Sequence, residues 1–194
     1  MMPTHYALSD AAIVLVTIFA GHALWRNGWI LTAFAMACFG IAAGVGVVRF
    51  GGGLQDALAA LHSGASQLLG LAGALAVVSH YLFPPKDRNG MRIFAVILCL
   101  ATAIFFFAHP FLGPLFLLAL MGAFFAAIVR PGTSQPKWLV PVACAVMLAN
   151  TLFIRQAPWL DAAVAWHAYH LVIALALAAL AKGVMSTEQR VASS

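Results

Sequence analysis

Charged side chains are scarce in this chain of 194 residues. They make up 8% of it, with only five Asp and Glu, whereas about a quarter of an ordinary soluble domain is charged. Hydrophobic residues reach 64%, well above the roughly 45–50% of soluble domains. A water-soluble globule is therefore excluded. Any chemistry must lie between membrane spans or in short loops.

Basic clusters and paired cysteines are also missing. The ten Lys and Arg stand singly in the predicted loops, which argues against a nucleic-acid partner despite the net charge of +5. Cys38, Cys99 and Cys144 fall in different apolar segments, so we expect no zinc ribbon or thioredoxin-like pair. Membrane lipids are the expected partners, and a homo-oligomer or a larger membrane complex stays open.

Apolar segments long enough to cross a bilayer follow one another along the chain. They predict an all-α polytopic membrane protein, a bundle of seven transmembrane helices that forms a single transmembrane domain over residues 1–194. The predicted spans are about 7–25, 28–49, 55–83, 91–108, 111–129, 138–154 and 162–182. The first is expected to be a retained span, since no basic stretch precedes it as in a signal peptide.

The basic residues predict how the bundle is oriented. With the N-terminus outside and the C-terminus inside, only Arg49 and Arg155 lie in outer loops. The other basic residues then lie on the inner side: Arg26, Lys86, Arg88, Arg92, Arg130, Lys137, Lys182 and Arg190. This asymmetry fits the positive-inside rule. We therefore expect an integral protein of the bacterial cytoplasmic (inner) membrane.

The third span separates into a polar and an apolar face. At 100° per residue, one arc of about 140° holds its polar and small residues. They are Asp56, His62, Ser63, Ser66, Gln67, Gly70, Gly73 and His80. Leucines fill the opposite side, and leucine faces lipid, so we expect the polar arc to line the interior of the bundle. The simpler alternative is that its serines and glycines only pack helices together.

The seventh span carries His167 and His170, which project about 60° apart and share an inward face. His62 lies at a similar depth below the outer surface, and the same outer layer holds further polar residues: Asp10, Arg49, Asp56, Ser63, Ser66, Asn150 and Tyr169. Their concentration in one leaflet predicts an outward-facing intramembrane polar pocket. The alternative for the histidine pair is hydrogen bonding across the bundle.

Three histidines at one depth can hold a metal ion. Three neutral imidazoles around Zn²⁺ leave a fourth position for water, which the metal converts to hydroxide near neutral pH. The predicted zinc ligands are His62, His167 and His170. Zinc hydroxide in an intramembrane pocket would suit hydrolysis of lipid amides or esters, which is the first functional hypothesis.

Other polar residues of the outer layer would serve such a hydrolase. Asp56 or Asp10 could orient or deprotonate the water. The residues predicted to donate hydrogen bonds to the developing oxyanion are Ser63, Ser66 and Asn150. Together with Asp56 they form the predicted catalytic set. The residues predicted to bind the substrate are Arg49, Trp166 and Tyr169. A cation beside Zn²⁺ requires that Asp56, or a substrate phosphate or carboxylate, neutralise Arg49.

Seven spans, an outside N-terminus and a histidine pair early in the last helix resemble the superfamily of alkaline ceramidases, progestin/adipoQ receptors and hemolysin-III-like proteins, or a bacterial membrane-protein family close to it. The resemblance implies an intramembrane zinc hydrolase site. That site combines a histidine late in the second helix, an Asp in the third and His-x-x-x-His in the seventh. Asp56, His167 and His170 fall at comparable places. The chain departs from the pattern, because its pair is His-x-x-His and its second helix ends in Val48-Arg49; His62 could replace the missing histidine.

Two other hypotheses remain open. A bis-histidine haem protein would use His62 and His80, about 27 Å apart on one face of the third span, with His22 and the pair in the last span as partners. A noncatalytic protein would bind a lipid or small molecule, or serve as an accessory subunit of a membrane complex. Ion-coupled transport is not favoured, since no carboxylate or Lys lies near the bilayer centre.

The zinc hypothesis predicts stoichiometric zinc in the purified protein. Elemental analysis of the wild type should find the metal, and the His167→Ala, His170→Ala double variant should lose it, because two of three ligands are removed. Absence of metal from wild-type protein purified without chelators would contradict the hypothesis.

Overall fold

The computed structural model describes residues 4–83, 90–107, 109–129, 138–155 and 157–186. Regular structure in these ranges is helical throughout. The long helices are α1 (Tyr6–Arg26), α2 (Ile30–Gly51), α3 (Ala59–Leu82), α4 (Gly90–Phe107), α5 (Leu112–Val129), α6 (Leu139–Ala149) and α7 (Ala162–Met185). A 3₁₀ turn, η1 (His109–Phe111), precedes α5, and a π-helical turn, η2 (Asn150–Ile154), continues α6. The predicted all-α bundle of seven helices is thus confirmed.

The helices have the length and surface of membrane spans. Five are long and apolar enough to cross a bilayer, namely α1, α2, α3, α5 and α7. The apolar helices Arg92–Phe107 and Leu139–Ile154 are shorter. Large apolar side chains face outward, and the exposed fractions of Phe19 and Leu175 are 72% and 70%. Lipid accepts such a surface, whereas water does not, so the chain is an integral membrane protein.

The predicted spans agree with the helices to within a few residues, except at the start of the third. Residues 52–58 form turns before α3 begins at Ala59, so Asp56 lies in a loop and not on the helix. The end of the fourth predicted span, at residue 108, lies outside the described residues. The same holds for the basic residues Lys86, Arg88, Arg130, Lys137 and Arg190. The orientation across the membrane therefore stays a prediction.

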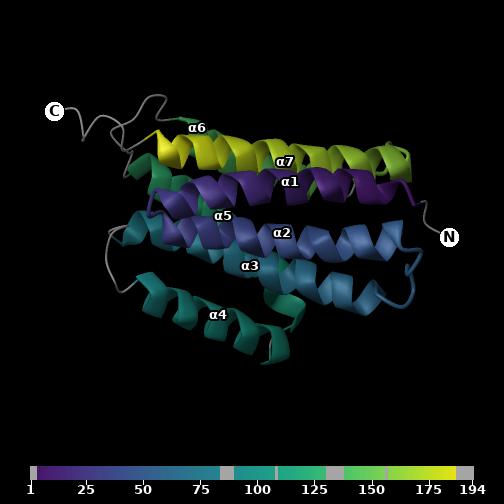
Figure 1. Cartoon of the computed structure of the whole chain (residues 1–194), viewed down its shortest axis with the longest axis horizontal. Helices are drawn as coiled ribbons and strands as arrows, with labels where there is room; N and C mark the ends of the chain where they lie inside the picture. The colour runs from purple at the N-terminus through teal and green to yellow at the C-terminus, as the bar shows by residue number, and fades with distance from the viewer. Residues whose placement is uncertain (1–3, 84–89, 108, 130–137, 156, 187–194) are drawn as a thin grey trace.

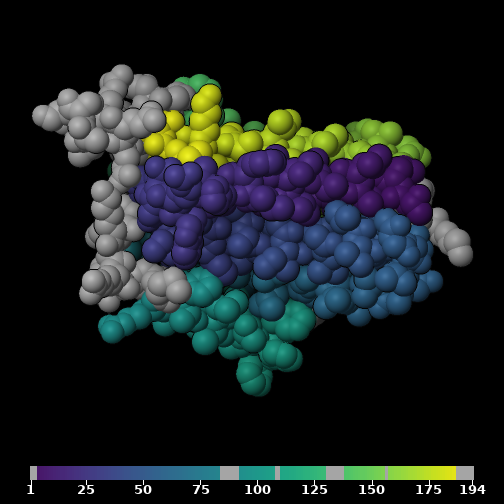
Figure 2. Space-filling view, viewed as in Figure 1, coloured from purple at the N-terminus to yellow at the C-terminus, as the bar shows by residue number. Residues whose placement is uncertain are grey.

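Six of the seven helices form a closed ring. Each contacts the next in the order α1, α2, α3, α5, α6 and α7, and α7 returns to α1. Helix α4 lies outside the ring against α3 and α2, and Figure 1 shows it set apart from the other helices. In the space-filling view α1 lies along its length between α7 and α2 (Figure 2). The interior of the ring is the place where polar side chains can avoid lipid.

Small residues allow the ring helices to approach closely. Ala35 on α2 and Ala72, Ala74 and Ala76 on α3 are fully buried, as expected where helices pack in a membrane. Gly183 on α7 has the same role against α6. A β-carbon there would lie 2.5 Å from Val140 Cγ2 and 3.3 Å from the Val140 backbone nitrogen.

This contact predicts that Gly183→Ala destabilises the bundle. The new methyl group would overlap Val140, which is 5% exposed, so α6 and α7 would have to separate. Overpacking of this kind costs about 1–3 kcal/mol, and thermal unfolding in detergent should show a lower midpoint. Gly44→Ala in α2 is the matched control, because a β-carbon there meets nothing within 4 Å. Equal effects of the two substitutions would contradict this explanation.

Candidate functional site

A cavity of about 660 Å³ lies inside the ring, in the half of the bundle where α1 begins. All six ring helices contribute to its lining, and none of the described side chains of α4 does. The lining combines charged or polar side chains, such as Asp10, Arg49 and His170, with apolar ones, such as Phe39 and Phe116. This half of the bundle is called the Asp10 end below.

Helix α2 shows how the cavity changes with depth. Arg49, in the last turn of α2, lies at the rim, and Gly46 lies one turn further in. Phe39 lies about 10 Å deeper than Gly46, at 1.5 Å per residue. The cavity therefore has a cationic rim and an apolar floor. Amphiphilic molecules have the matching distribution of polarity.

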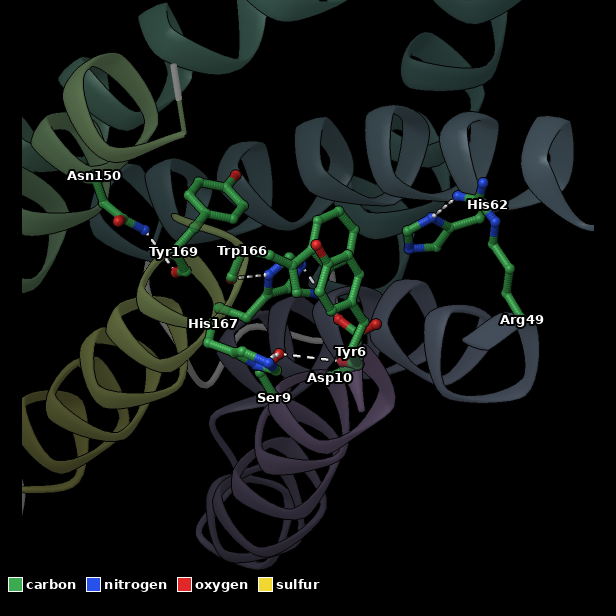
Figure 3. Close-up of polar contacts among 10 residues, drawn as sticks. Tyr6, Ser9, Asp10, Arg49, His62, Asn150, Trp166, His167 and Tyr169 are labelled. Carbon is green, nitrogen blue, oxygen red and sulfur yellow. Dashed lines mark hydrogen bonds and ion pairs between the residues drawn. The ribbon is translucent and has the colours of Figure 1, made fainter. Parts of the chain in front are cut away.

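Asp10 on α1 lies between two histidines. It is 1% exposed, and neither carboxylate oxygen has a hydrogen-bond partner in the described part of the chain. His170 Nε2 lies 3.2 Å from Asp10 Oδ1. A β-carbon on Gly46 would overlap Asp10 Oδ2 and lie 3.0 Å from His62 Nε2, so the missing side chain of Gly46 lets these two groups approach. Figure 3 shows Asp10 among the polar side chains of α2, α3 and α7.

Asp10 and His170 form a close acid–base pair, whose 3.2 Å contact is an ion-pair distance and not a hydrogen bond. His170 Nδ1 lies 2.7 Å from the carbonyl oxygen of Trp166, which can only accept, so we assign a proton to Nδ1. His170 Nε2 and Asp10 Oδ1 would then be two facing acceptors unless a further proton lies between them. The pair is therefore either imidazolium with carboxylate or imidazole with carboxylic acid. One proton can move between the two groups.

Arg49 holds His62 in the tautomer opposite to that of His170. Its Nη1 lies 3.1 Å from His62 Nδ1, and a guanidinium can only donate, so Nδ1 accepts and the ring proton lies on Nε2. Arg49 Nε also donates to the carbonyl oxygen of Gln55 at 2.8 Å. His62 therefore presents an N–H group on the side of Asp10, with a positive charge behind it.

Aromatic rings enclose these polar groups. The Trp166 ring stacks on Tyr6, with centroids 5.1 Å apart, and lies 4.3 Å from the His170 ring. Phe50, which is fully buried, contacts both Trp166 and His62 at its edge. The indole nitrogen of Trp166 is buried with no hydrogen-bond partner among the residues that the structure describes. Other atoms of Trp166 line the cavity.

His167 faces α1 instead of the cavity. Its Nδ1 lies 3.1 Å from Ser9 Oγ, and its Nε2 lies 2.7 Å from Nδ1 of His5. The 60° between His167 and His170 is enough to give the two rings different surroundings. His167 thus makes the hydrogen bonds across the bundle that were the alternative to metal binding.

The other predicted site residues divide into two groups. Those that line the cavity are Arg49, His62, Ser63, Ser66, Trp166, Tyr169 and His170. Asn150 and Asp56 do not line it. Asn150 is buried in η2 and its Nδ2 donates to the carbonyl of Tyr169 at 2.8 Å, while Asp56 is exposed in the loop before α3. Of the two carboxylates considered for activating water, Asp10 is the one at the cavity.

The π-helical turn η2 brings Arg155 to the cavity, which the sequence patterns did not indicate. The Arg155 N–H donates to the carbonyl of Asn150 five residues earlier, at 3.1 Å. This widened turn shifts the register of the helix, and such turns are frequent at functional sites. The Arg155 guanidinium lies 5.7 Å from the centre of the Tyr169 ring. Gly46, beside Asp10, is another residue that the sequence did not single out.

The zinc implied by the resemblance can be tested against this donor set. Asp10 and His170 suit two ligand positions, because a metal-bound histidine usually donates its other N–H to a carbonyl. His62 does not suit a third, since Arg49 keeps the proton on Nε2 and adds a positive charge. The described residues contain no group of three or more His, Cys, Asp or Glu that could hold a metal ion. The three-histidine site stays a prediction.

The haem hypothesis also stays a prediction. His80 lies near the other end of α3, and its ring centroid is 5.0 Å from that of Trp29. It is not among the residues that line the cavity at the Asp10 end.

Comparisons of the chain with protein-family models, with curated proteins and with solved structures find no match. The functional argument therefore depends on the cavity and its side chains.

The close contact between Asp10 and His170 predicts energetic coupling between the two residues. His170→Ala should destabilise the wild type by about 1–3 kcal/mol, because it leaves a buried carboxylate without its partner. In an Asp10→Ala background the same substitution should have little effect, which gives a coupling energy of about 1–3 kcal/mol. Unfolding of the four proteins in detergent measures it.

The control cycle combines Asp10→Ala with His80→Ala, near the other end of the bundle. Those two effects should add. Additive effects of Asp10→Ala and His170→Ala would contradict the pairing of these two residues.

Proposed function

We propose that this integral membrane protein hydrolyses an ester or amide bond of an amphiphilic lipid in the cavity at the Asp10 end. The observation that carries the proposal is the Asp10 carboxylate, buried between His170 and His62 in a cavity with a cationic rim and an apolar floor. A buried carboxylate in a membrane bundle is unfavourable for stability, which favours a functional role. The two histidines add a proton carrier and an N–H donor.

Hydrolysis would use Asp10 and His170 in their carboxylate and imidazolium form. Asp10 Oδ2 would take a proton from water as the water oxygen bonds to the carbonyl carbon. The N–H of His62, backed by Arg49, would stabilise the oxyanion. His170 would then give its Nε2 proton to the leaving alcohol or amine as the C–O or C–N bond breaks. Transfer of the new Asp10 proton to His170 would restore the pair.

A zinc-dependent form of the same hydrolysis is the second candidate. It is favoured by His170, whose Nδ1–H donates to a backbone carbonyl, and by the Asp10 oxygens, which have no hydrogen-bond partner among the described residues. A bound zinc ion would supply a Lewis acid that generates hydroxide from water. His62 would have to release Arg49 before it could bind the metal. Elemental analysis of His170→Ala beside the wild type distinguishes the two forms.

The proposed hydrolysis predicts that Asp10→Asn and His170→Gln each lower kcat by about 100-fold or more, since each removes part of the proton transfer. The measurement is release of fatty acid from acyl esters and N-acyl amides in mixed micelles. His22→Gln is the matched control, because His22 is an exposed histidine near the other end of α1. It should keep wild-type activity.

Two results would overturn the hydrolase. One is equal activity of wild type and Asp10→Asn, and the other is a wild-type rate no higher than that of micelles without protein. The cavity would then be a binding site without catalysis.

A further inference from the structure

We infer that the ligand of the cavity is a single-chain amphiphile with an anionic headgroup, bound with its head between Arg49 and Arg155 and its chain toward the apolar floor. This inference names the substrate class of the proposed function. It depends on the cavity as the ligand site, and not on hydrolysis itself.

The rim of the cavity has two guanidinium groups, Arg49 and Arg155, that form no ion pair among the described residues. Arg155 is exposed at the rim, and its guanidinium has no hydrogen bond or ion pair within the described ranges. Arg49 contacts Gln55, His62 and the Phe50 ring, none of which is acidic. Both arginines line the same cavity as His62.

Two acidic residues of the described part of the chain already have partners of their own. Asp10 pairs with His170, and Asp161 caps α7 by accepting from the backbone N–H groups of Ala163 and Val164. Asp56 is exposed in its loop. The other two acidic residues, Asp87 and Glu188, lie outside the described residues. Two guanidinium groups at one rim, with no acidic partner among the residues described, are the arrangement that binds phosphate or carboxylate.

The deeper part of the cavity fits an apolar chain. Phe39, Phe116 and Ile173 line it below the level of Asp10. From Arg49 to Phe39 the cavity extends about 15 Å along α2 at 1.5 Å per residue. A volume of about 660 Å³ lies within the range of pockets that bind one small ligand, so one acyl chain with its headgroup is the expected size.

The spacing along α2 places the reacting bond close to the headgroup. Gly46, at the level of Asp10, lies one turn, about 5 Å, below Arg49. A ligand with an acidic group a few bonds from an acyl ester or amide could place the acidic group at Arg49 and the ester or amide at Asp10. N-acyl amino acids and anionic monoacyl phospholipids have this chemistry.

Calorimetric titration of the purified protein in a maltoside detergent tests the inference with three probes. They are dodecyl phosphate, dodecylphosphocholine and inorganic phosphate. We expect dodecyl phosphate to bind about tenfold more tightly than dodecylphosphocholine, because its headgroup carries net negative charge for the two arginines. Inorganic phosphate should bind more weakly than dodecyl phosphate, because it lacks the chain.

Variants of Arg155 test the headgroup position. Arg155→Gln should abolish the preference for dodecyl phosphate, and Arg155→Lys should keep part of it, because the charge remains and the planar fork is lost. The Arg155 side chain makes no hydrogen bond in the described structure, so the loss of this side chain should not prevent folding. Arg26→Gln, at the far end of α1, is the control and should keep the full preference.

Equal affinity for the two dodecyl probes, or a preference that Arg155→Gln leaves unchanged, would overturn the inference. Inorganic phosphate that binds as tightly as dodecyl phosphate would also overturn it and indicate a site for free anions. A preference for dodecyl phosphate in a protein without hydrolytic activity would refute the proposed function and support the ligand class.

Discussion

The Asp10 carboxylate is the constraint on which the site depends. A carboxylate that is 1% exposed in an apolar bundle needs a proton, a cation or hydrogen-bond donors, because an isolated buried charge is strongly unfavourable. Helix α7 supplies His170, α3 supplies His62, and α2 supplies both Arg49 and the space at Gly46. Four of the six ring helices therefore meet at one side chain. A shift of any of these four helices changes the surroundings of this carboxylate.

The first turns of α7 combine two roles on neighbouring faces. His167 and the stacked pair of Trp166 and Tyr6 hold α7 against α1. His170, one turn further along, faces the cavity. The hydrogen bond of its Nδ1 to the Trp166 carbonyl fixes its ring proton on Nδ1. Contacts that stabilise the bundle thus fix the orientation of the groups that would carry out its chemistry. Such support from rigid helices gives a site the geometric precision that catalysis needs.

Much of the fold and part of the site follow from the sequence alone. A bilayer requires long apolar helices, so the seven helices and the polar face of α3 are predictable, and Ser63 and Ser66 lie at the cavity as helical periodicity indicates. The contact between Asp10 and His170 joins the first and last helices, and no local pattern specifies which helices become neighbours in the ring. Asp56 misses the cavity because turns occupy residues 52–58, and Arg155 reaches it through a π-helical turn that a regular period does not anticipate.

The position of α4 outside the ring has an electrostatic consequence. Because α4 crosses the bundle externally, α3 and α5 become parallel neighbours, as are α7 and α1 (Figure 1). Four of the six ring helices therefore begin in the half of the bundle that holds the cavity, and two end there. Each helix start has a partial positive charge of about half an elementary charge, and each helix end has the opposite charge. The backbone dipoles thus leave a net positive potential at the cavity, so the ring order itself favours anions over cations there.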